Sequence, residues 1–321
     1  MNLIEIYYDL RADLEIVEKR LLKEVQSNEK VLQKASAHLL KAGGKRIRPV
    51  FVLLAAKFGE YDLERLSRVA VALELIHMAT LVHDDVIDDA DKRRGSPTVK
   101  SAWGNRIAMY TGDFILARAL QILADVPDLR SHQILADSIV QMCEGEIEQV
   151  RDFYRFDQHL RTYLRRIKRK TALLLSVSCT LGALAANCKE TVVQALGKYA
   201  YNLGMAFQIT DDILDMTATE KKLGKPVGSD LRQGNITLPV LYACRVPETA
   251  NTLRRLIHRD MTDQEVASAI SRIRSVGAIE QSQALADRYL ARALKHLDAL
   301  PNLEWKEKLR QIAIFISKRE Y

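Results

Sequence analysis

Leu81-Val-His-Asp-Asp-Val-Ile-Asp-Asp89 is the stretch that decides how this chain is organised. It ends the segment from Leu63 to Leu81, which consists mostly of Val, Ala, Leu, Ile and Met and predicts a buried helix. On a helix, Asp84 and Asp88 lie four residues apart on one face, where their like charges repel each other. The partial negative charge at a helix C-terminus adds to this repulsion. Like charges on one helix face and acidic residues at a helix C-terminus are both unfavourable, and their coincidence indicates a functional site.

A divalent cation would relieve the repulsion between these aspartates. Carboxylates without Cys or clustered His favour magnesium, which keeps water ligands and shares the phosphate oxygens of a substrate. The alternative is a solvated acidic helix end, but a second cluster favours the metal site. Asp211-Asp212-Ile-Leu-Asp215 repeats the spacing after another apolar helical segment, residues 196–207. We expect the two helix ends to face each other across a cleft and to hold several ions around one polyphosphate.

The composition predicts a folded, all-α protein. The chain has 321 residues, of which 48% are hydrophobic, with only 14 Gly and 7 Pro, so it can bury a large core. Helical periodicity dominates, and neither a short repeat nor a Pro/Ser-rich linker interrupts it. The length allows one large domain or two smaller ones, and we expect a single helical domain over residues 1–321.

The cysteines and the apolar segments indicate a soluble, cytoplasmic protein. Cys143, Cys179, Cys188 and Cys244 show no metal-ligand spacing, and no secretory signal precedes them. The longest strongly apolar run, Thr171 to Ala186, is too short to span a bilayer and contains Ser, Thr and Gly. We therefore interpret it as a core helix and expect at most peripheral membrane contact.

The net charge does not indicate a nucleic-acid partner. The formal charge is +7, but aromatic residues make up only 6% of the chain and no nucleic-acid motif accompanies the basic residues. The densest basic run, Arg161 to Lys170, is typical of a solvated helix face approaching the core. Lys170 at its end is set apart by a motif described below.

Two basic segments are candidates for binding phosphate. Ala42-Gly-Gly-Lys-Arg-Ile-Arg-Pro49 combines two glycines, which allow a tight turn, with a proline suited to the first turn of a helix. Lys45 and Arg48 can then point into one pocket as diphosphate ligands, although the segment could also be an ordinary basic loop. Arg93 and Arg94 follow the first acidic cluster, either as its counter-ions or as phosphate ligands.

The helix before the first aspartates can also line an apolar channel. Glu74 and His77 interrupt its apolar sequence, and His77 is either a core residue or a residue bordering the cleft. Small Ala79 and Thr80 occupy the first turn below the aspartates, and Ile76 lies deeper. Each helical turn is about 5.4 Å long, which is comparable to an extended five-carbon unit. We expect the channel to be open at Ala79 and to close near Ile76.

Three further segments carry local signals. Thr217 to Asn235 lacks helical periodicity, and its position directly after metal ligands favours a lid over the site. Thr262-Asp-Gln-Glu265 has the pattern of a capping box. The acidic segment from Glu144 to Gln149 either lines the cavity or is surface charge.

These motifs together resemble those of the trans-prenyltransferases, the all-helical synthases of linear polyprenyl diphosphates. The likeness covers nearly the whole chain and is greatest to the large, motif-bearing components of two-component heptaprenyl diphosphate synthases. It rests on Gly44-Lys45-Arg46-Ile-Arg48-Pro49, His83-Asp84-Asp85-x-x-Asp88, Arg93-Arg94-Gly95, Lys170-Thr171 and Gly204-x-x-Phe207-Gln208-x-x-Asp211-Asp212-x-x-Asp215.

The resemblance implies a fold and a role for each matched residue. The fold would be a single helical bundle of the isoprenoid synthase type with a central active-site cavity. Magnesium would be bound by Asp84, Asp88 and Asp211, with Asp85, Asp212 and Asp215 completing the acidic motifs. Isopentenyl diphosphate would be held by Lys45, Arg48, His77 and Arg94. The allylic diphosphate would meet Arg93, Lys170, Thr171, Gln208 and Lys225.

The resemblance also implies the reaction and the partners. The enzyme would add isopentenyl diphosphate units to an allylic diphosphate such as farnesyl diphosphate, with three magnesium ions when substrate is bound. The product would be heptaprenyl diphosphate for the menaquinone side chain, with its length set at Ile76, Ala79 and Thr80. The chain would act as a dimer, specifically a heterodimer with a small, motif-poor subunit. It departs from long-chain relatives at Asn235, where many carry Lys, so a charged phosphate contact there is lost.

Competing interpretations remain open on sequence grounds. A class I terpene cyclase would replace the second aspartate cluster with an Asn/Ser/Glu metal motif, which Asp211 to Asp215 argues against. A di-iron bundle would need suitably placed Glu-x-x-His pairs, which this sequence lacks. A homodimeric synthase with a different product length and a non-catalytic regulatory subunit are the remaining alternatives.

Overall fold

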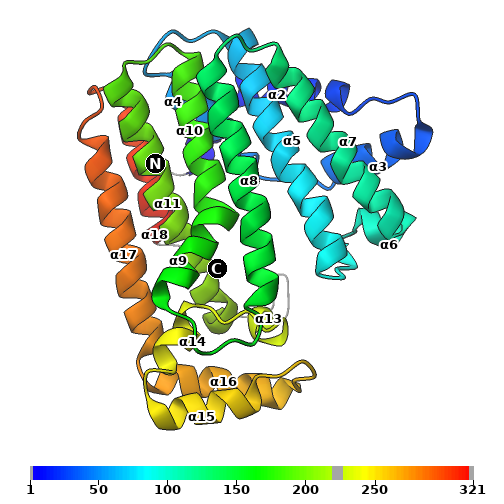
Figure 1. Ribbon diagram of the computed structural model, residues 1–321. Helices are drawn as coiled ribbons and strands as arrows, with labels where there is room; N and C mark the ends of the chain where they lie inside the picture. Colours follow the sequence, from blue (N-terminus) through cyan, green and yellow to red (C-terminus); the bar gives the residue numbers. More distant parts are fainter. Residues whose placement is uncertain (1–2, 219–226, 318–321) are drawn as a thin grey trace. The chain divides into compact units, whose positions relative to one another are not determined.

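Helix α5 (Leu63–Ile87) carries the first acidic cluster at its C-terminal end. In the computed structural model, which describes residues 3–218 and 227–317, this helix begins where the side chain of Asp62 accepts hydrogen bonds from the backbone N–H groups of Glu64 and Arg65. Those bonds satisfy two amides that a helix start leaves without partners. Most of its apolar residues are buried, and it packs against α7 (Asn105–Ala124) (Figure 1). The prediction of a buried helix ending in aspartates is confirmed.

The described part of the chain is almost entirely helical, which confirms the all-α class. The other helices are α1 (Leu3–Asp9), α2 (Arg11–Glu24), α3 (Lys30–Lys41), α4 (Ile47–Ala56), α6 (Val99–Trp103), α8 (Leu129–Arg151), α9 (Leu160–Ile167), the π-helix η1 (Lys168–Ala172), α10 (Leu173–Ala185), α11 (Glu190–Thr217), α13 (Ser229–Arg232), α14 (Leu238–Ala243), α15 (Pro247–Leu256), α16 (Asp263–Ser275), α17 (Ala278–Leu297) and α18 (Glu304–Ser317).

A short hairpin was not predicted by the sequence. Strands β1 (Lys92–Arg93) and β2 (Ser96–Pro97) pair antiparallel directly after α5. The two turn residues, Arg94 and Gly95, both have positive φ, at 52° and 79°. A two-residue hairpin turn needs that conformation, and glycine adopts it without strain. The hairpin therefore holds the paired arginines next to the aspartates.

The chain forms two compact units that interleave along the sequence. Unit 1 comprises residues 1–135, 177–196 and 301–305, and unit 2 comprises residues 136–176, 197–300 and 306–321. Boundaries fall inside α8, α10, α11 and α18, so these helices contribute to both units. A single domain over residues 1–321 stays a prediction.

Unit 2 has its own hydrophobic core. Buried side chains from α9, α11 and α14 to α17 form one cluster, which includes Tyr163, Ile209 and Leu253. Helix α16 starts with the predicted capping box: Thr262 accepts from the amide of Glu265, and the Glu265 carboxylate accepts from the amide of Thr262. Each of these bonds satisfies an amide at the helix start. This prediction is confirmed.

The segment predicted as a lid is partly helical. Thr217 is the last residue of α11, and Ser229–Arg232 forms α13, so the prediction of a continuous loop from Thr217 to Asn235 was wrong at both ends. Gly228 starts α13 with a positive φ of 71°, which the sequence pattern alone did not reveal. Lys225 lies outside the described residues.

Two helices are long and apolar enough to cross a membrane by length and composition alone. They are α5 and α7, both of which exceed the run from Thr171 to Ala186 that the sequence suggested as the longest. Within their most apolar stretches, 72% of the α5 residues and 39% of the α7 residues are buried inside the protein. The core helix of a soluble protein meets the same criteria, and the burial of α5 matches that description.

The cysteines differ in accessibility, which predicts how they react. All four are free; Cys143 is exposed, and Cys179 is buried. Burial raises the pKa of Cys188 to about 11, and it also raises the pKa values of Cys179 and Cys244. At pH 8 these three thiols stay protonated, and the thiolate is the reactive form. We expect one fast-reacting thiol per folded chain in a dithionitrobenzoate assay and four after unfolding, with the fast phase lost in Cys143→Ser. A fast phase that persists in this variant would contradict the assignment.

Candidate active site

The acidic cluster in unit 1 divides into buried and accessible carboxylates. Asp85 is only 1% exposed, and its Oδ1 accepts hydrogen bonds from Nε and Nη2 of Arg93, each at 2.8 Å. Its Oδ2 is buried and has no hydrogen-bond partner within the described residues. Arg93 is therefore a counter-ion of the cluster, as one of the two sequence interpretations held. The pair keeps the Asp85 charge compensated inside the protein.

Of Asp84, Asp85 and Asp88, a metal ion can reach Asp84 and Asp88, while the exposed Asp89 pairs with Lys100. Asp84 is partly exposed and Asp88 is exposed, whereas Asp85 faces the interior. Within residues 3–218 and 227–317, no three Asp, Glu, His or Cys side chains converge closely enough to hold a metal ion. Magnesium commonly uses one or two carboxylates together with waters and substrate phosphates. The accessible pair, which offers only oxygen ligands, fits that type of site.

The basic group in unit 1 surrounds His77. Arg48 is partly buried, and its Nε has no hydrogen-bond partner among the residues that the structure describes. Arg94 donates from Nη1 to the backbone oxygen of Gly43, and Lys45 is exposed on the same segment. A buried guanidinium nitrogen without a partner costs free energy unless a ligand or water accepts its hydrogen. The group therefore suits an anionic ligand.

The electrostatics of this group keep His77 neutral. Burial lowers the pKa of His77 well below 6.5, and the positive charges of Arg48 and Arg94 lower it further. Burial also lowers the pKa of Arg48 to about 10, and the nearby Glu74 carboxylate opposes that shift. At neutral pH, His77 is thus an uncharged hydrogen-bonding group and the arginines carry the positive charge.

In unit 2, Asp212 is a hydrogen-bond acceptor inside the core. It is 4% exposed, and its two oxygens accept from the Tyr163 hydroxyl at 2.7 Å and from Nε2 of Gln208 at 3.0 Å. Burial raises the pKa of Asp212 to about 6, although both hydrogen bonds act in the opposite direction. The predicted residue Gln208 also accepts a hydrogen bond from the Thr171 hydroxyl at 2.6 Å. Asp212 therefore orients Gln208 and Thr171.

The other two aspartates of this cluster differ in the same way as those in unit 1. Asp215 is 1% exposed and accepts from the Ser229 hydroxyl at 3.0 Å and the Asp230 amide at 3.1 Å. These bonds connect the end of α11 to α13. Asp211 is partly exposed and is the most accessible member of the cluster. Among the three, Asp211 is best placed to bind a metal ion.

A π-helix carries the predicted residues Lys170 and Thr171. Element η1 spans Lys168–Ala172, between α9 and α10. Single π-turns inside helices are rare and occur frequently at functional sites. Lys170 donates to the side chain of Gln149 at 3.1 Å, while Arg169 pairs with Glu144 and Glu148. The acidic segment of α8 is thus an ion-pair surface for η1, which neither sequence interpretation described.

The predicted chain-length residues lie on α5. Ile76 and Ala79 are 1% and 2% exposed, while Thr80 is partly exposed and donates its hydroxyl hydrogen to the backbone oxygen of His77 at 2.7 Å. The channel along this face stays a prediction.

Tyr163 and Arg46 are site-supporting residues that sequence reasoning missed. Tyr163 belongs to the basic run interpreted as a solvated face, but it is fully buried and contacts Asp212. Leu160, Tyr163, Leu164 and Ile167 recur at helical intervals, which was an available signal for a buried face. Arg46 lies within a motif, yet its partners come from distant helices.

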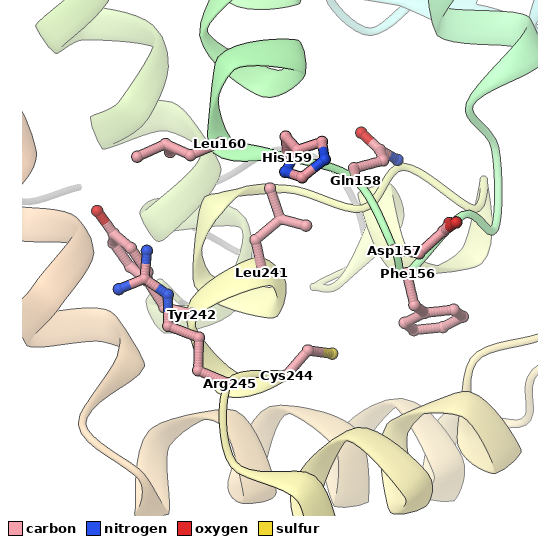
Figure 2. A pocket seen from close by; sticks show the side chains of 9 residues that line it. All are labelled: Phe156, Asp157, Gln158, His159, Leu160, Leu241, Tyr242, Cys244 and Arg245. Atoms are coloured by element: carbon pink, nitrogen blue, oxygen red, sulfur yellow. The ribbon is translucent and has the colours of Figure 1, made fainter.

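A pocket of about 310 Å³ in unit 2 lies apart from every predicted residue. Figure 2 shows Arg245 beside Tyr242 on one side, with His159 and Gln158 on another. The guanidinium carbon of Arg245 lies 4.4 Å from the centre of the Tyr242 ring, and Gln158 donates to backbone oxygens of its own loop. None of the residues that line the pocket belongs to the acidic or basic groups described above.

Comparisons with known proteins identify the family of this chain. Residues 29–273 match the family described as Polyprenyl synthetase. The chain is 58% identical over 321 residues, covering all of both chains, to heptaprenyl diphosphate synthase component 2 of Geobacillus stearothermophilus. The crystal structure of a heptaprenyl diphosphate synthase from Staphylococcus aureus is 44% identical, with a TM-score of 0.92 and coverage of 97% of this chain and 98% of that one.

A third relative was solved with ligands. The polyprenyl synthase of Caulobacter crescentus, complexed with calcium and isoprenyl diphosphate, is 33% identical with a TM-score of 0.93, and the match covers 99% of this chain and 98% of that one. The family match spans most of the chain, and the all-α fold agrees with that of the solved relatives. The chain therefore belongs to the polyprenyl synthetase family.

Proposed function

We propose that this chain is a magnesium-dependent trans-polyprenyl diphosphate synthase that adds isopentenyl diphosphate units to an allylic diphosphate, with farnesyl diphosphate as the primer. Its product is heptaprenyl diphosphate for the menaquinone side chain, made in the cytoplasm together with a small partner subunit. The observation that carries this proposal is the 58% identity, over the full length of both chains, to a protein named as one component of a two-component heptaprenyl diphosphate synthase.

In this proposal each group of candidate residues has its own role in the reaction. Isopentenyl diphosphate binds the basic group of unit 1, which consists of Lys45, Arg48, His77 and Arg94. The allylic diphosphate is contacted by Arg93, Lys170, Thr171, Gln208 and Lys225. Asp84, Asp88 and Asp211 bind magnesium, three ions when substrate is present, while Asp85, Asp212 and Asp215 orient their neighbours. The difference in exposure within each acidic cluster supports this division of roles.

The residues of unit 2 are suited to stabilise a developing cation. Because the Thr171 hydroxyl donates its hydrogen to Gln208, both of its lone pairs remain available on the oxygen. Asp212 fixes Gln208 in the orientation that accepts this hydrogen. The oxygen dipoles can therefore face positive charge without reorganisation, which is the main source of electrostatic catalysis.

The reaction consists of one bond exchange repeated for each unit added. The allylic C–O bond breaks, and Lys170 and the arginines stabilise the departing diphosphate. Bound magnesium adds Lewis-acid stabilisation of the same charge. The double bond of isopentenyl diphosphate attacks the allylic carbon to form the new C–C bond. The proton then lost passes to the released diphosphate, and the longer allylic product becomes the next substrate.

The test is incubation of the purified chain with labelled isopentenyl diphosphate, farnesyl diphosphate and magnesium, with and without purified candidate partners from among the proteins encoded nearby. We expect a heptaprenyl product only with a partner present, and none after chelation of the metal. Product from the isolated chain would refute the requirement for a partner. Failure to incorporate label both with and without these proteins would refute the enzymatic function itself.

The length of the product should respond to two positions on α5. Ile76→Gly is expected to lengthen the product by removing a stop in the channel, and Ala79→Phe to shorten it by closing the entrance. Both residues are buried, so overpacking by the larger side chain in Ala79→Phe must be separated from channel closure. Ala70→Phe is the control, because Ala70 is equally buried on the opposite side of the same helix.

Product chromatography and melting temperatures together distinguish the two effects. Ala70→Phe should lower the melting temperature without changing product length. If Ile76→Gly and Ala79→Phe both gave products of the original length, the channel would not lie along this face.

A further inference from the structure

The turn between α3 and α4 is held by side chains from three other helices and the hairpin. Arg46, at the start of α4, has a left-handed conformation with φ 45° and ψ 38°, which is strained for a residue with a side chain. The Tyr7 hydroxyl of α1 donates to the backbone oxygen of Lys45, and Arg94 donates to that of Gly43. The remaining anchors all bind the guanidinium of Arg46.

Arg46 connects two carboxylates on different helices. Its Nε and Nη2 donate to the two oxygens of Glu18 on α2, both at 2.8 Å, and its Nη1 donates to Glu74 on α5 at 3.3 Å. Nη2 also reaches the backbone oxygen of Leu40 at 3.3 Å. The Arg46 side chain is 12% exposed and that of Glu74 is 4% exposed. Bidentate, partly buried pairs of this kind fix geometry as well as charge.

The charge balance at this position matters because of what lies beside it. Lys45 precedes Arg46 and Arg48 follows two residues later, and both belong to the basic group of unit 1. Arg48 has a buried Nε and Glu74 a buried Oε2, and neither atom has a partner among the described residues. Glu74 also acts electrostatically on Arg48 and Arg94. Without Arg46, Glu18 and Glu74 would lose the guanidinium that pairs with both of them, next to a site for an anion.

We propose that Arg46 is a positioning residue for isopentenyl diphosphate: it holds the turn that presents Lys45 and Arg48, and it neutralises Glu18 and Glu74 so that these carboxylates do not repel the diphosphate. The proposal rests on the function proposed above and extends it to residues outside the ligand-binding set. It predicts a defect specific to one of the two substrates.

The primary variant is Arg46→Met, which keeps the aliphatic stem and removes the charge. We expect the KM for isopentenyl diphosphate to rise at least about tenfold, because one partner of a partly buried charge network is lost. The KM for the allylic diphosphate should stay within about twofold. The double variant Arg46→Met/Glu74→Gln also removes the negative charge of Glu74. Its KM for isopentenyl diphosphate should therefore be lower than that of Arg46→Met by about threefold or more.

A matched control and a second variant distinguish a specific loss of substrate binding from a general loss of stability. Arg20 also connects α2 to α5, through Glu64 at 3.1 Å and Ser67 at 3.0 Å, but it has no contact with the turn. Arg20→Met should therefore lower stability without changing either KM. Arg46→Gly removes the side chain while allowing the left-handed backbone, so it should fold and show the same rise in KM.

Calorimetric titration of isopentenyl diphosphate carries the test independently of turnover. Absence of product with the unaltered protein would refute the proposed function, whereas weaker binding to Arg46→Gly than to the unaltered protein would still support the role of Arg46. Unchanged binding and KM for isopentenyl diphosphate in Arg46→Gly would overturn the proposal. An equal rise in both KM values, without recovery in the double variant, would also overturn it.

Discussion

Asp84→Asn is expected to lower kcat for chain elongation by about 10²- to 10³-fold, the range typical for loss of one group that stabilises transition-state charge. Asp84 is partly exposed at the end of α5, one helical turn before Asp88. Asparagine keeps the shape of the side chain but removes the charge that a magnesium ion requires from its ligand. Because the substitution is isosteric, the fold should be unaffected.

Asp89→Asn is the matched control for this prediction. Asp89 lies next to Asp88 and is likewise exposed, but it has a positive φ of 52° and pairs with Lys100 at 2.5 Å. Asparagine tolerates the left-handed conformation, so the backbone should be kept. Steady-state rates measured over a range of magnesium concentrations should show a higher magnesium requirement for Asp84→Asn only. Equal effects of the two substitutions would mean that general charge, rather than ligation, matters here.

The difference between Asp84 and Asp85 shows both the reach and the limit of sequence reasoning. Periodicity correctly predicted an apolar helix ending in aspartates, and the repeated spacing predicted a second one. The spacing argument alone did not separate the buried aspartate from the accessible ones, although successive residues on a helix are separated by about 100°. Asp85 continues the face of Met78 and Val82, both of which are buried. That alignment was present in the sequence and would have predicted its burial.

Other features depend on contacts that no local pattern contains. Arg46 is held by Glu18 and Glu74, which precede and follow it by 28 residues, so only the packing of α2 against α5 brings them together. The π-helix that contains Thr171 has hydrogen bonds between residues five apart, where an α-helix has them between residues four apart. The apolar pattern of the sequence did not indicate this change. The hairpin turn at Arg94 uses a residue that rarely adopts positive φ, so turn chemistry gave little warning.

Gly204→Ala is expected to affect both stability and catalysis through one close contact. A Cβ at residue 204 would lie 2.6 Å from the Cα of Ala172 and 3.0 Å from its Cβ, so α11 and η1 would have to separate. Overpacking of a core costs about 1–3 kcal/mol. The gain in helix propensity from Gly to Ala, about 1 kcal/mol, offsets part of that cost. We expect the free energy of unfolding to fall by up to about 2 kcal/mol.

The kcat of Gly204→Ala should fall even where the variant is fully folded, so the loss of stability alone does not account for it. Gln208 lies one turn after Gly204 on α11, and Thr171 precedes Ala172 in η1, so separation of the two elements stretches the 2.6 Å hydrogen bond between their side chains. Because that bond orients the oxygen dipoles toward the developing cation, kcat should fall at least about tenfold at temperatures where the variant is fully folded. Lys198→Ala, at an exposed position of α11, is the control and should change neither quantity. A destabilised variant with unchanged kcat would separate the helix contact from catalysis and remove Thr171 and Gln208 from the proposed mechanism.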